Sequence, residues 1–309
     1  MKIKWIILFL LLPIVGITQV TGEHYKIYSV EKGKEVKLKD IIKAMKNADV
    51  LFFGEEHNDS VGHYLEHTIF RMLHEKYDDK VTLSLEMFDR DVQTIMDEYL
   101  KHDIRERNFK KDARVWSNYG DYRPMVEYAK ENALDVVCAN ASSRYTNLAG
   151  RKGQEALMAL SDDAKRYIAP LPYEVASGAY YDKLVSFMGG NPHDTSDSTK
   201  QAQATMHFGG FDLITAQSLW DATMAWSIAS YLSQNEGMKV FQVNGRFHSD
   251  EGFAIVTQLK NYRPDLRSLV ISSGSEDDFD EPDWSKYVQQ GDFIIITDPN
   301  VPRTYESGF

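Results

Sequence analysis

Short apolar runs recur along the chain, each bounded by polar residues or glycine. They have the length of strands rather than helices, and several are rich in β-branched residues. The six runs are residues 49–53, 81–85, 135–139, 239–243, 267–271 and 292–297. Amphipathic, helix-like stretches alternate with them at residues 62–75, 92–100, 122–132 and 252–261. This alternation predicts an α/β fold with a mostly parallel sheet flanked by helices.

The interval from about 150 to 235 follows a different pattern. It contains helical patterns at residues 154–167, 174–188 and 199–233, the last interrupted by a pair of glycines, and no convincing strand. We interpret it as a helical insertion over the crevice at the carboxyl ends of the strands, within one α/β domain spanning residues 23–309. The turn-rich segment 189–198 is predicted to be a mobile cover.

The first 22 residues are typical of a signal peptide. Lys2 and Lys4 precede an apolar run at 5–15, and small or polar residues follow at 16–22. The run is shorter than the roughly 20 apolar residues that span a bilayer, although an uncleaved anchor is the alternative. We therefore expect an exported protein of the periplasm or cell envelope. No cysteine near the expected cleavage point offers a site for lipid attachment.

Composition and charge remove several classes of function. The chain has 309 residues, 43% of them apolar and 12% aromatic, which excludes a disordered protein. Its formal net charge is −11, and loss of Lys2 and Lys4 makes it more negative, so nucleic acid is not an expected partner. Cys138 is the single cysteine and cannot form an internal disulfide, so we interpret it as a small buried apolar residue.

One short motif occurs twice, each time directly after a predicted strand. Gly54-Glu-Glu-His57 follows the first run and Gly245-Arg-Phe-His248 follows the fourth. In open parallel sheets, ligands bind in the crevice beyond the carboxyl ends of the strands, so both histidines are expected there. We expect the two glycines to let the chain turn sharply as it leaves each strand.

Other polar side chains occupy equivalent positions at strand ends. Glu86 ends the second predicted strand, Asn140 ends the third, and Arg144 lies just beyond it. A single residue of this kind is ordinarily a cap or a surface group. His57, Glu86, Asn140 and His248 at the same end of one sheet instead predict a functional site, because titratable residues grouped in a cleft mark such sites.

Further candidates lie near these four residues. Glu55 directly follows the first glycine and is predicted to point inward, whereas Glu56 faces solvent. His63 is expected to reach the crevice. It is also the first residue of a sequence that formally matches the H-x-x-E-H zinc motif. That motif needs a further ligand, which we cannot identify, so we assign no separate zinc site. Gln217 and Asp221 share one face of an apolar helix, so they either cap strands or line the crevice floor.

Taken together, these residues resemble the ChaN-like family of the haem-binding uptake and Tiki superfamily, which also resembles erythromycin esterases. The resemblance spans about residues 36–293. It rests on Gly54-Glu-Glu-His57, His63, Glu86, Trp116-x-x-Tyr119, Tyr122-Arg-Pro124, Asn140, Gln217-x-x-Trp-Asp221 and the second Gly-x-x-His motif at His248. It implies an α/β fold, an exported bacterial protein and haem binding linked to iron acquisition. Family members are often lipoproteins, and this chain lacks the lipid-accepting cysteine.

Haem binding requires a flat apolar slot, a side chain that reaches the iron, and cations for the propionates. Candidates for these roles are Tyr180, Tyr181, Met206 and His207, with Arg114, Arg123 and Arg144 for the propionates. For each of them, ordinary packing or a solvated surface is the alternative. The resemblance also leaves open a homodimer and an outer-membrane uptake partner, with haem or another small molecule as the ligand.

The resemblance also implies an alternative function, that of a hydrolase. Tiki-type relatives use the paired histidines and a glutamate for metal-dependent hydrolysis, and His57, Glu86 and His248 match those positions. Two imidazoles and a carboxylate form an open site that holds a divalent metal and lowers the pKa of bound water. In esterase-like relatives the histidine acts as a general base without an obligatory metal, supported here by Glu55 or Glu86.

Overall fold

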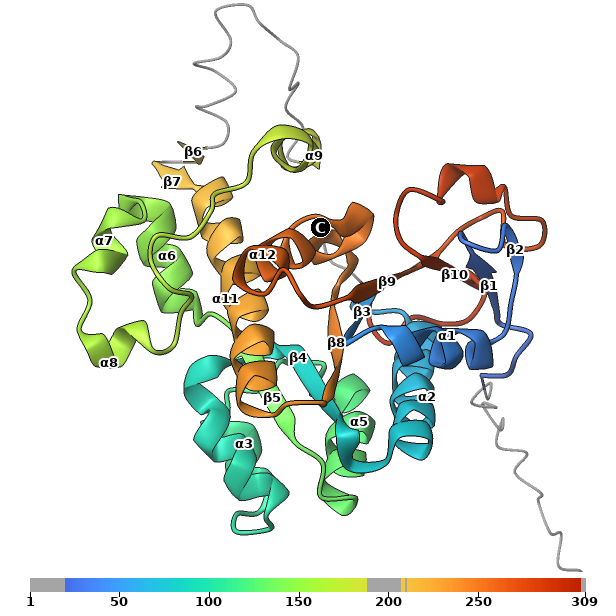
Figure 1. Ribbon diagram of the computed structural model, residues 1–309, viewed down its shortest axis with the longest axis horizontal. Helices are drawn as coiled ribbons and strands as arrows, with labels where there is room; N and C mark the ends of the chain where they lie inside the picture. The colour runs from blue at the N-terminus through green and yellow to red at the C-terminus, as the bar shows by residue number, and fades with distance from the viewer. Residues whose placement is uncertain (1–19, 188–206, 209, 307–309) are drawn as a thin grey trace, which may run out of the picture.

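A computed structural model describes residues 20–187, 207–208 and 210–306 of the chain (Figure 1). Nearly all of the predicted signal peptide, and all of the predicted cover at 189–198, lie outside the described residues. An eight-stranded sheet forms the centre of the fold. In spatial order its strands are β2 (Lys34–Glu35), β1 (Tyr25–Ser29), β10 (Phe293–Thr297), β9 (Ser268–Ser275), β3 (Val50–Glu55), β8 (Lys239–Gly245), β4 (Val81–Asp89) and β5 (Val136–Asn140).

The six strands from β10 to β5 are parallel, and they are the six that the apolar runs predicted. The mostly parallel α/β fold is therefore confirmed. Two antiparallel strands, β1 and β2, were not predicted. β1 buries only Ile27 and Ser29 of its five residues, and β2 is exposed throughout, so neither contains the continuous apolar run of a central strand.

The direction of the connections reverses between β3 and β8. From β3 the chain crosses through α2 (Ser60–Tyr77) to β4, on one side, whereas from β8 it crosses through α12 (Ile255–Tyr262) to β9, on the other. β3 and β8 are neighbours, with Glu55 opposite Gly245 in the register. Such a switch point opens a space beyond the strand ends, where open α/β sheets bind ligands.

Helices cover both faces of the sheet, and side chains along β3 alternate between them. Leu51 and Phe53 pack with one group of helices, and Val50 and Phe52 pack with the other. The first group comprises α1 (Leu38–Ala44), α2, α3 (Gln93–Leu100), α4 (Glu106–Asp112) and α5 (Tyr119–Glu131). The second comprises α11 (Leu213–Gln234) and α12.

The described residues of the interval predicted to be a helical insertion are mainly helical. They contain α6 (Ser143–Lys152), α7 (Glu155–Met158), α8 (Asp162–Lys165), α9 (Gly178–Phe187) and α11, with a short hairpin of β6 (His207–Phe208) and β7 (Phe211–Asp212) that was not predicted. Figure 1 shows α11 between α6 and the sheet, where it contacts β5 and β8.

Two helix boundaries in this interval differ from the sequence prediction because of capping residues. The helix expected at 154–167 is divided into α7 and α8, since the Ser161 side chain accepts a hydrogen bond from Ala164 and starts a new helix. Of the helix expected at 199–233, residues 199–206 and 209 lie outside the described residues; α11 begins at Leu213, where Asp212 caps it by accepting from Thr215.

Short 3₁₀ turns complete the described structure, at Met45–Asn47, Asp78–Lys80, Arg90–Val92, Arg246–His248, Asp250–Gly252 and Trp284–Lys286. None of the helices within the described ranges combines the length and apolarity needed to cross a bilayer.

Candidate functional site

Two imidazoles meet at the switch point between β3 and β8. His57 lies two residues beyond β3, and His248 ends the 3₁₀ turn that follows β8. Gly245 lies against His57 and Glu86: a Cβ atom added to it would be 2.8 Å from His57 Nε2 and 3.7 Å from Glu86 Oε2. The Gly245 amide donates to Glu86 Oε2 at 2.7 Å, and His248 Nε2 is 3.5 Å from Glu86 Oε1. Both imidazoles therefore face Glu86.

The first imidazole is held by a carboxylate and a tyrosine. Glu55, the last residue of β3, accepts hydrogen bonds at its Oε1 from His57 Nδ1 and from the Tyr122 hydroxyl, both at 2.7 Å. Burial by itself would raise the pKa of Glu55, but hydrogen bonds with His57 and His63 outweigh burial and lower this pKa. Glu55 is thus an ionised acceptor, and His57 Nδ1 carries the proton that it donates.

The second imidazole is held in the same way from different elements. Asp221 of α11 accepts from His248 Nδ1 at 2.5 Å and from the Tyr180 hydroxyl at 2.7 Å. Burial raises the pKa of Asp221 against the attraction of His248. Burial lowers the pKa of His248, but the charges of Glu86 and Asp221 prevail and raise it to about 9. At neutral pH His248 is therefore a cation.

Two matching Tyr–carboxylate–His chains thus approach one central glutamate. In each chain the carboxylate fixes the tautomer and the orientation of the ring, so that Nε2 faces Glu86. Burial lowers the pKa of His57, but the hydrogen bond to Glu55 and the charge of Glu86 raise it more strongly, against a smaller repulsion from His248. The arrangement suits proton transfer, or ligation of a metal by two imidazoles.

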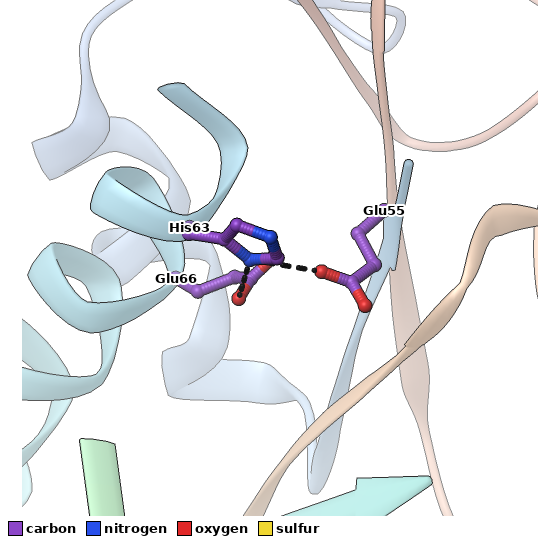
Figure 2. A group of neighbouring side chains, drawn as sticks. All are labelled: Glu55, His63 and Glu66. Atoms are coloured by element: carbon purple, nitrogen blue, oxygen red, sulfur yellow. Dashed lines mark hydrogen bonds and ion pairs between the residues drawn. The ribbon is translucent and has the colours of Figure 1, made fainter. Parts of the chain in front are cut away.

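A second layer of charge lies behind Glu55 (Figure 2). His63 Nδ1 is 3.2 Å from Glu55 Oε2 and 3.2 Å from Glu66 Oε2, both oxygens belonging to buried carboxyls. Burial opposes protonation of His63, but the two carboxyls raise its pKa to about 12. The pKa of Glu66 is also raised, by burial and by the charge of Glu55. We interpret the cluster as a protonated His63 held between two buried carboxyls, of which Glu55 is the more acidic.

A divalent metal was predicted at His57, Glu86 and His248. Among the described residues, the group whose ligand atoms all lie within 4.8 Å of one another is instead Glu55, His63 and Glu66. The donor set of two Nε2 atoms and one carboxylate nevertheless suits zinc, and both rings have the outer carboxylate that usually orients a metal-bound histidine. Metal binding at His57, Glu86 and His248 remains a prediction.

The two motif glycines are present for a reason other than the sharp turn that we expected. Gly245 has φ −53° and ψ 133°, which any residue adopts. Its missing side chain instead makes room for His57. At Gly54, an added Cβ would lie 2.8 Å from Arg246 Cα and 2.9 Å from Ser249 Oγ. Both glycines therefore permit close packing of the two strand ends.

The model of the family described as "Haem-binding uptake, Tiki superfamily, ChaN" matches residues 41–259, more than half of the chain. The protein belongs to the ChaN family. This confirms the resemblance that the motifs indicated. Among curated proteins, no significant match to the chain is found.

The fold is shared with one solved structure, and a second solved structure is less similar. A ChaN-family structure from Campylobacter jejuni, described as showing cofacial haem binding, superposes with a TM-score of 0.64 at 16% identity, covering 89% of this chain and 98% of that one. An erythromycin esterase, EreC, in its open conformation, gives a TM-score of 0.47 at 11% identity, covering 81% and 77%.

The supporting residues predicted for this ChaN-family chain have different environments. Gln217 Nε2 lies 3.2 Å from His248 Nδ1 and 3.3 Å from its Nε2, so Gln217 and Asp221 both line the site rather than cap strands. His63 reaches the site through Glu55. Asn140 is buried, and its Oδ1 accepts from the amide of Ala141 at 2.9 Å, so it stabilises the turn after β5.

The candidates for haem ligation and propionate binding are more scattered. Each of the three arginines is paired with a carboxylate: Arg114 with Asp89 and Asp91, Arg123 with Glu106, and Arg144 with Asp91. The structure describes His207 only as part of the strand β6, and Met206 lies outside the described residues. Tyr181 packs, partly exposed, with the cluster of Tyr180 and Leu184.

Two residues of the site were not predicted from the sequence. Tyr122 lies in a stretch that carried the family resemblance, but its bond to Glu55 depends on the packing of α5 beside α2. Glu66 had a local signal: it falls on the buried stripe of α2 with Leu65 and Ile69, where an acidic residue needs a partner.

Proposed function

We propose that this protein is an exported haem-binding protein that takes part in iron acquisition. Membership of the ChaN family supports the proposal, as does the fold shared with a protein described as binding haem cofacially. The structural observation that carries it is an exposed aromatic surface next to the imidazole site.

This α9 aromatic surface consists of Phe187, Phe247 and Lys183. Phe187, at the end of α9, is 76% exposed, and its ring centroid lies 5.1 Å from that of Phe247, the residue before His248. The Lys183 ammonium lies 5.2 Å from the centroid of the Phe247 ring. Flat apolar rings beside a cation are what a porphyrin with propionates requires.

Of the two tyrosines on α9, we favour Tyr181 as the side chain that meets the iron. Tyr180 is only 8% exposed, so its ring offers little surface to a porphyrin. Tyr181 follows it on the same helix and is partly exposed. When bound, haem supplies an iron atom whose axial position a tyrosine oxygen can fill.

Titration of the purified protein with haem tests this proposal. We expect a shifted Soret band that saturates at a fixed stoichiometry. Phe187→Ser should weaken binding about tenfold or more, because it removes exposed apolar area on which the porphyrin packs. Tyr181→Phe should change the position of the Soret band.

Met158→Ser is the matched control, since Met158 is also an exposed apolar residue, 46% exposed on α7. It should leave haem binding unchanged. Absence of a saturable Soret shift in the wild-type protein, or equal weakening by both serine substitutions, would contradict haem binding at this surface.

Export and the role in uptake have separate tests. The full-length chain should appear in the cell envelope fraction without its first 22 residues, and a deletion strain should grow poorly with haem as its sole iron source.

Sedimentation with and without haem tests for a homodimer, since a porphyrin on an open surface leaves one face for a second copy. An outer-membrane uptake partner belongs to the same proposal.

A second function, hydrolysis, is favoured by one specific observation: the two Tyr–carboxylate–His chains that face Glu86. A water held by one imidazole and Glu86 would attack an ester carbonyl, and the protonated His248 would stabilise or protonate the departing oxygen. If these residues instead hold a divalent metal, it supplies an acidified water, and His248 first has to lose its proton.

Activity on an ester and amide panel, measured together with metal content, tests the second function. His57→Gln and His248→Gln should each lower the rate at least a hundredfold. The matched control is His67→Gln on α2, whose ring lies 5.9 Å from that of Tyr128. Unchanged activity and metal content in both site variants would remove this function from consideration.

A further inference from the structure

Three buried side chains behind His57 form a cluster in which His63 and Glu66 take no direct part in haem binding or hydrolysis. Glu55 is the last residue of β3, and His63 and Glu66 lie one turn apart on α2. Figure 2 shows both carboxyl groups pointing toward the His63 ring. We refer to Glu55, His63 and Glu66 as the β3–α2 cluster.

The His63 ring is fixed so that one of its nitrogens faces both carboxyls. Its Nε2 lies 3.1 Å from the backbone oxygen of His57, which can only accept, so Nε2 carries a hydrogen. Its Nδ1 is 3.2 Å from Glu55 Oε2 and 3.2 Å from Glu66 Oε2. Metal-bound histidines are held in the same way, with one nitrogen donating to a carbonyl oxygen and the other facing the ion.

A single proton on Nδ1 does not satisfy this cluster. Nδ1 is hydrogen-bonded to Glu66 Oε2. Glu55 and Glu66 are 2% and 0% exposed. Among the described residues, neither Glu55 Oε2 nor Glu66 Oε1 has a hydrogen-bond donor in good geometry. Buried carboxyl oxygens without partners are costly, and a cation that contacts both groups removes that cost.

The spacing of the donor atoms suits an ion that needs no open cavity. Ligand atoms about 2.0 Å from a tetrahedral ion stand about 3.3 Å apart. The two N···O distances in the β3–α2 cluster are 3.2 Å, and one donor atom from each residue lies within 4.8 Å of the others. Asp121 Oδ2 lies 3.6 Å from His63 Nε2 and adds negative charge at the partly exposed side of the cluster.

The sequence of α2 contains part of this ligand set. His63 and Glu66 belong to the H-x-x-E-H match, for which the sequence offered no further ligand. In the structure β3 supplies that ligand, Glu55. His67, the last residue of the match, is not a member of the cluster, because its ring packs against Tyr128 with the centroids 5.9 Å apart.

The donor set favours a divalent transition ion over calcium or magnesium. One imidazole nitrogen with carboxylate oxygens suits zinc. Calcium and magnesium take six or more ligands, all or nearly all of them oxygens, which this cluster does not supply. Two ionised carboxylates and a neutral imidazole also balance the charge of one divalent ion, so the buried site is neutral once the ion is bound.

We propose that the β3–α2 cluster binds a divalent transition ion, best matched by zinc, through Glu55 Oε2, His63 Nδ1 and Glu66 Oε2. The ion takes the place of the proton on Nδ1, which leaves to solvent. It ties the end of β3 to α2 directly behind His57, and Glu55 Oε1 keeps its hydrogen bonds with His57 and Tyr122.

This site shares no ligand with the metal site predicted at His57, Glu86 and His248. It also shares no residue with the α9 aromatic surface, so its failure would leave the haem proposal standing.

Calorimetric titration of the metal-free full chain with Zn²⁺ tests the proposal. It is repeated in His248→Gln, in which the other predicted metal site lacks a ligand. We expect zinc binding in both proteins and a Tm that rises with zinc. In the His248→Gln background, Glu66→Gln should weaken zinc binding at least about a hundredfold, more than the loss of a group behind a ligand costs. His63→Gln should have the same effect.

Glu75→Gln is the matched control, since Glu75 lies on the same helix with its side chain 63% exposed. It should bind zinc as the His248→Gln background does. Near-ultraviolet circular dichroism of the metal-free variants checks that they are folded. Absence of zinc binding in His248→Gln, tighter binding of Mg²⁺ than of Zn²⁺, or unchanged zinc affinity in both Glu66→Gln and His63→Gln would each overturn the proposal.

Discussion

At the scale of single residues, Gly245 sets how closely the two halves of the imidazole site approach. Its amide binds Glu86, and the space beside its Cα holds His57 Nε2. The geometry of the site therefore requires that residue 245 is a glycine, without a side chain.

Gly245→Ala should consequently destabilise the protein by about 1–3 kcal/mol, because the added methyl group lies 2.8 Å from His57 Nε2 and forces the ring to move. Urea unfolding measures this change. Gly120→Ala is the control: an added Cβ there meets nothing within 4 Å, and alanine favours the helix α5. A loss in Gly245→Ala no larger than in the control would contradict the packing argument.

The charge on His63 gives a prediction about pH. Its pKa is raised to about 12 in the folded protein and is near 6.5 in the unfolded chain, so its stabilising contribution is complete below pH 6.5 and is lost as the pH rises toward 12. Between pH 7.5 and 10 the stability difference between wild type and His63→Gln should shrink by up to about 1.4 kcal/mol per pH unit.

Denaturant unfolding at several pH values checks this dependence. His67→Gln should show no such slope over the same range, because burial lowers the pKa of His67 and its ring is neutral in both states. A flat difference for His63→Gln would mean that His63 is neutral in the folded protein.

At the scale of elements, the β5 edge is protected by one side chain. Gln93 of α3 binds two backbone groups of β5 as a neighbouring strand would. Gln93→Leu should cost about 1–3 kcal/mol, since it leaves a buried amide and carbonyl without partners. It should also promote self-association through the exposed edge.

Urea unfolding and sedimentation velocity measure these two effects. Gln234→Leu is suitable for comparison, because Gln234 lies exposed at the last position of α11. If both variants behaved alike, the bonds from Gln93 would not protect the strand.

The elements also show how much of the fold is readable from sequence. Buried parallel strands are apolar on both faces, so six of them were predictable as continuous runs. β1 lies near the sheet margin with only two buried residues, which gives no such run. The start of α11 could not be predicted from the apolar pattern, because it depends on a single capping residue, Asp212.

The residues of the site that directly follow strands could be predicted from the sequence. His57 and His248 follow adjacent strands, and the rule for parallel sheets places them together. The partners that orient them could not be derived in the same way. Tyr122 and Tyr180 reach their carboxylates from helices, and their positions depend on tertiary packing rather than on any local pattern.

At the scale of the whole molecule, the sheet couples residues that are almost two hundred positions apart. The pKa of His57 is raised by the charge of Glu86 and lowered by that of His248. His248→Gln should therefore raise the pKa of His57, and Glu86→Gln should lower it. NMR titration of the His57 ring measures both shifts, and shifts of the same sign would contradict the shared charge environment.

The strand order also affects the chain as it is made. Both neighbours of β3 in the sheet, β8 and β9, lie in the last third of the sequence, and β8 also fills the gap between β3 and β4. While the ribosome is still translating α11, the apolar strand β3 has no partner, and such an edge pairs readily with other polypeptides. We therefore expect the nascent protein to require a chaperone until β8 has emerged, and a fragment truncated before that point to aggregate.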